Sequence, residues 1–143
     1  MPTANATFTV KEPPAQVWKV VNDLQRIGSL IPEVTRVDVI DEKTADWEVT
    51  VKVGFLKRTL SVHSAITESD PPKHEAFKGE SPEADMMGSV DLSPTADGGT
   101  NISYTIGAKG KGSLGPVIDS LLEQRLAKET TEVGDKLRKM LGE

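Results

Sequence analysis

The chain has no cysteine and only two histidines among its 143 residues. The missing thiols exclude disulfides, thiolate nucleophiles and zinc or iron–sulfur sites with cysteine ligands. Two histidines are a poor start for a Ser-His-Asp triad, and any metal site would depend on carboxylates. His63 and His74 lack the spacing of known metal motifs, so we expect both on the surface. The sequence therefore predicts no catalytic residue set, no metal and no cofactor.

An excess of basic charge, a secretory signal and a long apolar run are also missing. The chain carries 17 basic and 22 acidic residues, a net charge of −5, whereas nucleic-acid-binding domains are normally basic. No apolar stretch approaches the ~20 residues that cross a bilayer. Residues 1–5 have neither the basic nor the apolar segment of a secretory signal. We therefore expect a cytoplasmic protein with no nucleic-acid partner and at most transient membrane contact.

Aromatic residues make up only 4% of the chain, so its interior must consist mainly of aliphatic side chains. A chain of this length is typical of one domain that buries about 68% of the surface its unfolded form exposes. No internal repeat, low-complexity tract or linker divides the sequence. We therefore treat residues 1–143 as a single domain.

Apolar residues recur at every second position over much of the chain, which predicts strands. The expected strands lie around residues 6–11, 37–39, 47–53, 60–66, Phe77, 86–92 and 102–106. Pro13 and Pro14 end the first strand and begin a short helix, because proline suits the first helical turn. A second short helical turn follows near Gly28. The other six strands come after this helical pair and are expected to pair antiparallel.

The last segment has a helical period instead. From Pro116 to about Leu141 the apolar residues form one stripe about 100° wide, made of Ile118, Leu122, Leu126, Val133, Leu137 and Met140. This helix is the only expected element large enough to cover the apolar face of the sheet. A curved sheet around one helix leaves a gap, which is a ready site for an apolar ligand. The predicted fold class is α+β.

Short motifs along the whole chain resemble the helix-grip (SRPBCC, START-like) superfamily. They are residues 8–18, Asn22-Asp23, Ile31-Pro32 and residues 51–54, 70–72, 92–94 and 97–100. More narrowly, they are similar to the CoxG group, which is associated with carbon monoxide dehydrogenase. The resemblance implies a curved seven-stranded antiparallel sheet around a long C-terminal helix, with two short helices after the first strand. It also implies a lipid or quinone-like ligand and service to a molybdenum-containing CO-dehydrogenase-type enzyme.

The chain departs from the CoxG pattern in two segments. Ile31-Pro32-Glu33-Val34 stands where the group usually reads Ile-Pro-Gly-Cys. Many members also carry a glycine-rich segment after the fifth strand, where this chain has only the short run of residues 80–84. The resemblance is therefore more specific for the superfamily than for the subgroup.

We expect the ligand to lie between the sheet and the C-terminal helix. The residues predicted to contact it are Trp47, Val62, Phe77, Met86, Tyr104, Leu122, Leu126 and Glu129. Glu129 interrupts the apolar stripe and is either a polar anchor for the ligand or an i, i+4 ion-pair partner of Arg125. Tyr104 needs a hydrogen-bond partner once buried. Met86 is either a flexible wall that accepts varied apolar ligands or ordinary core filler.

Residues 110–115 match the dinucleotide fingerprint G-x-G-x-x-G. That motif needs a further parallel strand and an acidic residue about 20 residues on, whereas here a helix runs to the end. We interpret the three glycines as a flexible lead-in to the helix, or as a hinge that lets it lift and admit a ligand. Anion binding by backbone N–H groups at the helix start is the minor alternative.

Three functions are compatible with these features. The favoured one is a non-catalytic carrier of a hydrophobic small molecule, accessory to a CO-dehydrogenase-type enzyme. A polyketide cyclase or aromatase-like enzyme needs at least two convergent polar groups in the same cavity. A protein-interaction module, such as a chaperone activator, is expected to have a filled core and a large exposed apolar patch. The sequence does not predict an oligomeric state.

Overall fold

The computed structural model describes residues 3–30, 33–53 and 55–143, with side chains except at 4, 51, 53, 56, 114, 118, 121–122, 125–131 and 133. Seven strands form one antiparallel sheet in the order β1-β7-β6-β5-β4-β3-β2. Their bounds are β1 (Thr3–Val10), β2 (Val34–Val39), β3 (Thr44–Val53), β4 (Leu56–Asp70), β5 (His74–Glu80), β6 (Ala84–Pro94) and β7 (Thr100–Gly110). The predicted seven-stranded antiparallel sheet is confirmed, although β4 is longer than the sequence indicated.

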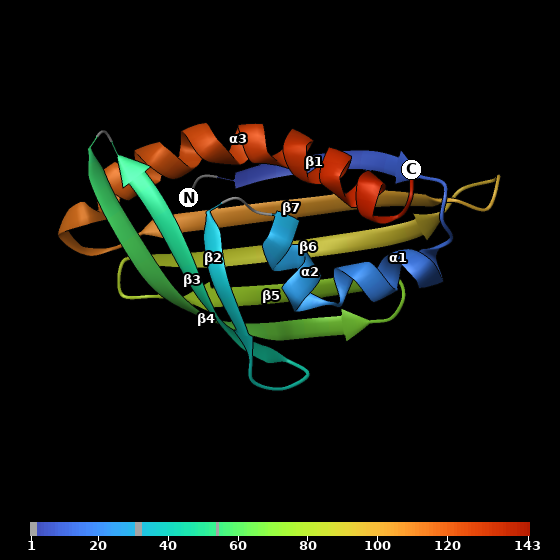
Figure 1. The fold of residues 1–143 in the computed structure, drawn as a ribbon, viewed down its shortest axis with the longest axis horizontal. Coiled ribbons are helices and arrows are strands. Elements are labelled where there is room, and N and C mark those ends of the chain that lie inside the picture. Colours follow the sequence, from blue (N-terminus) through green and yellow to red (C-terminus); the bar gives the residue numbers. More distant parts are fainter. Residues whose placement is uncertain (1–2, 31–32, 54) are drawn as a thin grey trace.

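Among the described residues, three α-helices accompany the sheet, and Figure 1 shows how they lie against it. They are α1 (Pro14–Val21), α2 (Leu24–Leu30) and α3 (Gly115–Met140), and a short 3-10 turn at Gly112–Leu114 precedes α3. Pro14 lies at the start of α1, where its missing N–H leaves no helical hydrogen bond unmade. The predicted helical pair after the first strand is confirmed.

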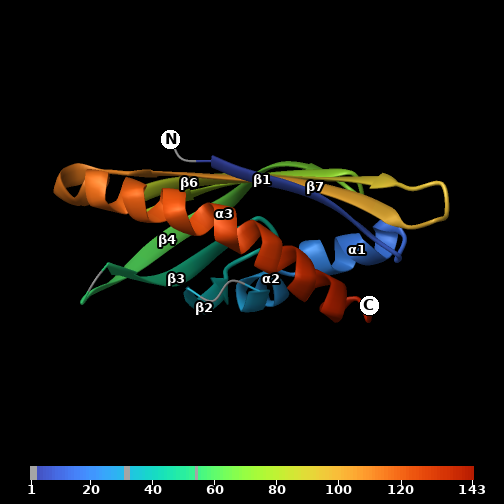
Figure 2. The same cartoon turned by 90° about the horizontal axis from the view of Figure 1, so that it is seen from above.

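Each of the three helices packs against a different part of the sheet. α3 lies along β1 and β7, whereas α1 contacts β6 and α2 contacts β2. Seen from above, β2 and β3 bend toward the same side as the helices, so the sheet is strongly curved (Figure 2). The expectation that the C-terminal helix alone covers the sheet is therefore corrected, because one helix contacts mainly the edge formed by β1 and β7.

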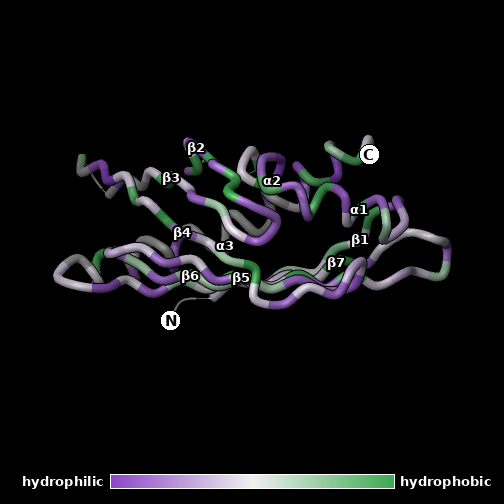
Figure 3. Tube along the Cα trace, turned by 90° about the horizontal axis from the view of Figure 1, so that it is seen from below, coloured by the Kyte–Doolittle hydropathy of each residue, from purple (hydrophilic) through white to green (hydrophobic). Residues whose placement is uncertain are grey.

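A closed core fills the end of the sheet near α1 and the C-terminal end of α3. We call closed core the buried cluster Val10, Val17, Val20, Leu30, Leu92, Ile102 and Leu137, of which no member is more than 4% exposed. Hydropathy alternates along the strands, as Figure 3 shows, because successive side chains point to opposite faces of the sheet. The closed core accordingly uses one face of the sheet only.

Two glycines give a paired test of this packing. Gly134 in α3 has room for a side chain, since a Cβ there would lie 3.5 Å from the ring of Phe8. We expect Gly134→Ala to raise the free energy of unfolding by about 0.5–1 kcal/mol, because glycine weakens a helix interior. Urea denaturation measures the change, and a loss of stability would contradict the packing of α3 against β1.

Gly88→Ala is the matched substitution, and we expect it to lower the free energy of unfolding. A Cβ on Gly88 would lie 2.4 Å from the ring of Phe77, so the ring must move. We expect this variant to lose about 1–3 kcal/mol of stability in the same urea experiment, as is usual for overpacking.

Candidate ligand-binding site

One face of the sheet, which we call the inward face, turns toward the helices and carries the predicted site residues. Trp47 on β3 lies directly opposite Val62 on β4. The Trp47 ring lies close to α2, since a Cβ on Gly28 would be 3.4 Å from it. Val62 is 2.9 Å from the position of a Cβ on Gly79 of β5. Phe77 shares this face because it is two residues from Gly79 along the strand.

The inward face continues across β6 and β7. The ring of Phe77 covers Gly88, and Met86 is two residues from Gly88 on the same strand. Tyr104 follows Ile102 of the closed core by two residues and is itself buried. The five described site residues, Trp47, Val62, Phe77, Met86 and Tyr104, therefore lie on one face of the sheet.

The other three predicted site residues belong to α3. Leu122, Leu126 and Glu129 lie within the helix bounds, but their side chains are outside the described residues. The same holds for Arg125, the predicted ion-pair partner of Glu129. Both interpretations of Glu129 stay predictions.

Part of the inward face is incompletely covered. Phe77 is 39% exposed, and Trp47, Ile66 and Met86 are half-buried. The closed core, in contrast, excludes solvent almost completely. The inward face thus has a closed part under α1 and the end of α3. Its open part over β3 to β6 consists of Trp47, Ile66, Phe77 and Met86, whereas Val62 beside them is only 5% exposed.

A cavity of about 460 Å³ adjoins the open part. Its described lining comes from the α1–α2 junction, the β2–β3 turn, β4 and β5: Asn22, Asp23, Leu24, Val39, Asp41, Glu42, Lys43, Ile66, Ser69 and Glu75. This volume falls within the range of about 300–1,000 Å³ that is typical of ligand sites. The five described site residues are not part of this lining. Ile66 joins the two regions, because it lines the cavity and lies opposite Phe77.

Glu75 is a buried carboxylate in the wall of this cavity. The residue is 6% exposed, and its Oε1 has no hydrogen-bond partner among the described residues. Burial raises the pKa of Glu75, and the neighbouring His74 opposes this shift. Glu75 is not among the residues predicted from the sequence, although the alternation of side chains places residue 75 on the same face as Phe77.

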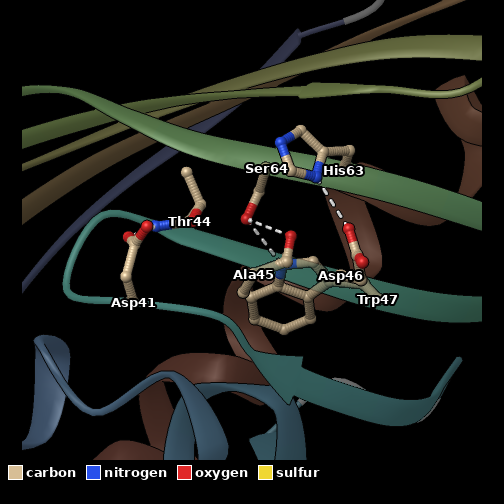
Figure 4. A network of polar contacts seen from close by, with 7 residues as sticks. All are labelled: Asp41, Thr44, Ala45, Asp46, Trp47, His63 and Ser64. Carbon is tan, nitrogen blue, oxygen red and sulfur yellow. Dashed lines mark hydrogen bonds and ion pairs between the residues drawn. The ribbon is translucent and has the colours of Figure 1, made fainter.

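The β2–β3 turn forms one rim of the cavity and is held by Asp41. The backbone N–H groups of Lys43 and Thr44 both donate to Asp41 Oδ1 at 2.8 Å. These hydrogen bonds lower the pKa of Asp41, so this carboxylate keeps its charge at the rim. Figure 4 shows Asp41 and Thr44 at the turn.

The indole N–H of Trp47 has a hydrogen-bond partner within the protein. Its indole N–H donates to Ser64 Oγ at 2.7 Å, and the Ser64 hydroxyl donates to the carbonyl of Ala45 at 3.2 Å (Figure 4). Trp47 therefore offers a ligand its ring and not its N–H.

Neither histidine belongs to the cavity lining, although His74 directly precedes Glu75 on β5. His63 is exposed, as predicted, and its Nδ1 is 2.7 Å from Asp46 Oδ1 (Figure 4). His74 is half-buried and lies between two carboxylates, 2.8 Å from Glu68 and 2.6 Å from Asp91. The hydrogen bond with Glu68, followed by that with Asp91, raises the pKa of His74. In the described part of the chain, no group of three or more His, Asp or Glu residues could hold a metal ion.

The glycine-rich segment before α3 forms a tight corner. A Cβ on Gly110 would lie 2.5 Å from the carbonyl oxygen of Gly115, and the φ of Gly112 is +73°. The N–H of Gly110 also donates to Asp119 Oδ1 at 2.6 Å. Close backbone approach and a positive φ explain these glycines without a nucleotide.

No α-helix among the described residues is long and apolar enough to span a membrane.

The curved sheet, its helices and the adjoining cavity define a helix-grip domain. The family described as "Polyketide cyclase / dehydrase and lipid transport" matches residues 1–142, and the chain belongs to this family. No curated protein matches the chain. These findings support the superfamily that the sequence motifs resemble, while membership of the CoxG group stays a prediction.

Solved structures share the fold at low sequence identity. A conserved protein from Geobacillus kaustophilus has a TM-score of 0.75 at 20% identity, covering 98% of this chain and 95% of its own. A START superfamily protein from Mycobacterium smegmatis has a TM-score of 0.71 at 11% identity, covering 97% and 98%. The Zhui aromatase/cyclase from Streptomyces sp. R1128 has a TM-score of 0.64 at 16% identity, covering 96% and 94%.

The burial of Glu75 predicts a pH-dependent gain of stability in Glu75→Gln. Because the pKa of Glu75 is raised on folding, its ionised form destabilises the folded state, and this penalty develops as pH rises above the ordinary glutamate pKa of about 4.3. We expect the variant to gain about 1 kcal/mol or more at pH 8 and nothing near pH 4. Urea denaturation at the two pH values measures this difference.

Glu80→Gln is the matched control, because Glu80 is exposed on the same strand. This control is expected to leave stability nearly unchanged at both pH values. A Glu75→Gln effect of the same size at pH 4 and pH 8 would contradict a buried, ionising carboxylate.

Proposed function

We propose that the protein binds a hydrophobic small molecule on the open part of the inward face and in the adjoining cavity. The observation that carries this proposal is the incomplete cover of Phe77 and Ile66 beside a 460 Å³ cavity. Burying such apolar surface contributes about 25 cal/mol per Å² before the costs of association. The family description, which includes lipid transport, is consistent with this role.

The proposed contacts extend the cavity lining toward α3. We propose that Trp47, Val62, Phe77, Met86 and Tyr104 contact the apolar part of the ligand from the sheet. Leu122, Leu126 and Glu129 are the proposed contacts from α3. Ile66 connects this set to the cavity, because it belongs to both the inward face and the lining.

A carrier without catalysis is the role we favour, and an enzyme of the cyclase type is the second candidate. Glu75 favours the enzyme, because a carboxyl with a raised pKa in a cavity is a common feature of acid–base catalysts. Turnover of an apolar polyketide-like substrate that stops in Glu75→Gln would favour the enzyme. The interaction-module hypothesis stays a prediction, because the closed core is filled while the apolar surface outside it adjoins a cavity.

The narrower context comes from the sequence resemblance alone. We propose service to a molybdenum-containing CO-dehydrogenase-type enzyme, and a cytoplasmic location, on the motifs shared with the CoxG group. The family description names neither. Copurification of such an enzyme with the tagged protein from its native host would support this context.

A bulky side chain at Ile66 is expected to abolish binding of an apolar probe. Ile66→Trp would fill the junction between the cavity and the inward face, whereas Ser61→Trp adds the same ring at an exposed position of the same strand. With the neutral fluorophore N-phenyl-1-naphthylamine, we expect Ile66→Trp to weaken binding by about tenfold or more, equivalent to ~1.4 kcal/mol. Ser61→Trp should bind like the parent protein.

Fluorescence titration of the three proteins measures these affinities, and mass spectrometry of a solvent extract identifies any copurified lipid. No binding of the fluorophore by the parent protein, together with no extracted lipid, would contradict the proposed function. Equal binding by both tryptophan variants would place the site elsewhere.

A further inference from the structure

Glu75 is a buried carboxylate in the cavity wall, and one of its oxygens has no hydrogen-bond partner among the described residues. A buried carboxylate oxygen without a hydrogen bond is costly, because burial removes its water without replacing it. Glu75 is 6% exposed, lines the cavity and leaves Oε1 unpartnered among the described residues. A molecule in the cavity that carries positive charge would offset the cost of ionising this buried carboxylate.

The rest of the described lining adds negative charge to the same cavity. Its charged side chains are four carboxylates, Asp23, Asp41, Glu42 and Glu75, and one ammonium, Lys43. Asp23 is paired with Arg26 at 3.4 Å, while Asp41 accepts two backbone N–H groups and keeps its charge. This excess of carboxylates attracts a cation and repels a ligand with a carboxylate head.

The apolar surface begins at Phe77, the next residue after Glu75 on the same face of β5. Glu75 and Phe77 share the inward face of β5, and two residues along a strand span about 6.6 Å. Ile66 lies opposite Phe77 and lines the cavity with Glu75. A molecule with a polar end at Glu75 therefore places its apolar body against Ile66 and Phe77.

We propose that the ligand is an apolar amine, with its ammonium group bound by Glu75 inside the acidic rim and its hydrocarbon body on the inward face. This inference rests on the proposed function, which accounts for binding of the hydrocarbon body. It adds the chemical class of the ligand's head group. A hydrogen bond between an ammonium and a carboxylate is among the stronger ones in proteins, which gives the head group its selectivity.

The ionisation of Glu75 makes this binding pH-dependent. The charged groups that face the cavity are Asp23 from the α1–α2 junction and Asp41, Glu42 and Lys43 from the β2–β3 turn. On its own strand, His74 is the neighbouring charge. An alkyl ammonium stays protonated up to about pH 10. Its affinity therefore rises with pH as Glu75, whose pKa burial raises, becomes ionised.

A series of probes with one hydrocarbon chain and different heads tests the inference. Decylamine, decanol and decanoate are titrated at pH 8, below their micellar concentrations, as competitors of N-phenyl-1-naphthylamine. We expect decylamine to bind about tenfold or more tighter than decanol, and decanoate to bind most weakly. In Glu75→Gln the decylamine advantage falls to about threefold or less, whereas Glu80→Gln keeps the full advantage.

Each outcome decides between the two proposals. Equal affinity for decylamine and decanol, or an amine advantage that survives in Glu75→Gln, overturns the amine inference and leaves apolar binding intact. No displacement by any of the three probes, and no binding of the fluorophore, contradicts the proposed function itself. Urea denaturation shows that each variant is folded before titration.

Discussion

A seven-stranded sheet is about 29 Å across at the usual strand spacing, whereas one helix with its side chains is about 10 Å wide. A single helix along β1 and β7 therefore cannot cover the whole inward face of this sheet. The sheet is curved, and α1 and α2 lie on the same side of it as α3 (Figure 2). Cover is complete over the closed core and incomplete over β3 to β6, where Phe77 is 39% exposed. The open part and its cavity follow from this mismatch in width.

The cavity region combines two features that lower the stability of the ligand-free protein. The partly exposed apolar side chains of Phe77 and Ile66 lack the burial that stabilises the closed core. Glu75 adds a buried carboxylate oxygen without a partner in the described part of the chain. A ligand with an apolar body and a cationic end relieves both costs at once. These side chains lower the free energy of unfolding at the cavity, whereas the closed core is fully packed. Such a local loss of stability is typical of binding sites.

Sequence reasoning predicted the face and not the cavity. Alternation along the strands favours one face for Trp47, Val62 and Phe77, because residues two apart on a strand point the same way. The strand pairing and the close approaches to Gly79 and Gly88 agree with this placement. Glu75 obeys the same alternation, but a lone glutamate at a strand start has the appearance of a solvated charge. The cavity walls come from the α1–α2 junction, the β2–β3 turn and β4 with β5, which are far apart in the sequence. A register shift between Ile66 and Glu68 further alters which residues meet there.

The central claim is that the open part of the inward face, and not the closed core, receives an apolar ligand. Methyl NMR with ¹³C-labelled isoleucine tests it directly, because Ile66 lines the cavity while Ile102 lies in the closed core. During titration with N-phenyl-1-naphthylamine, we predict a saturable shift of the Ile66 methyl resonance and a nearly constant Ile102 resonance. An unmoved Ile66 resonance, or an equal shift of both, would contradict the claim.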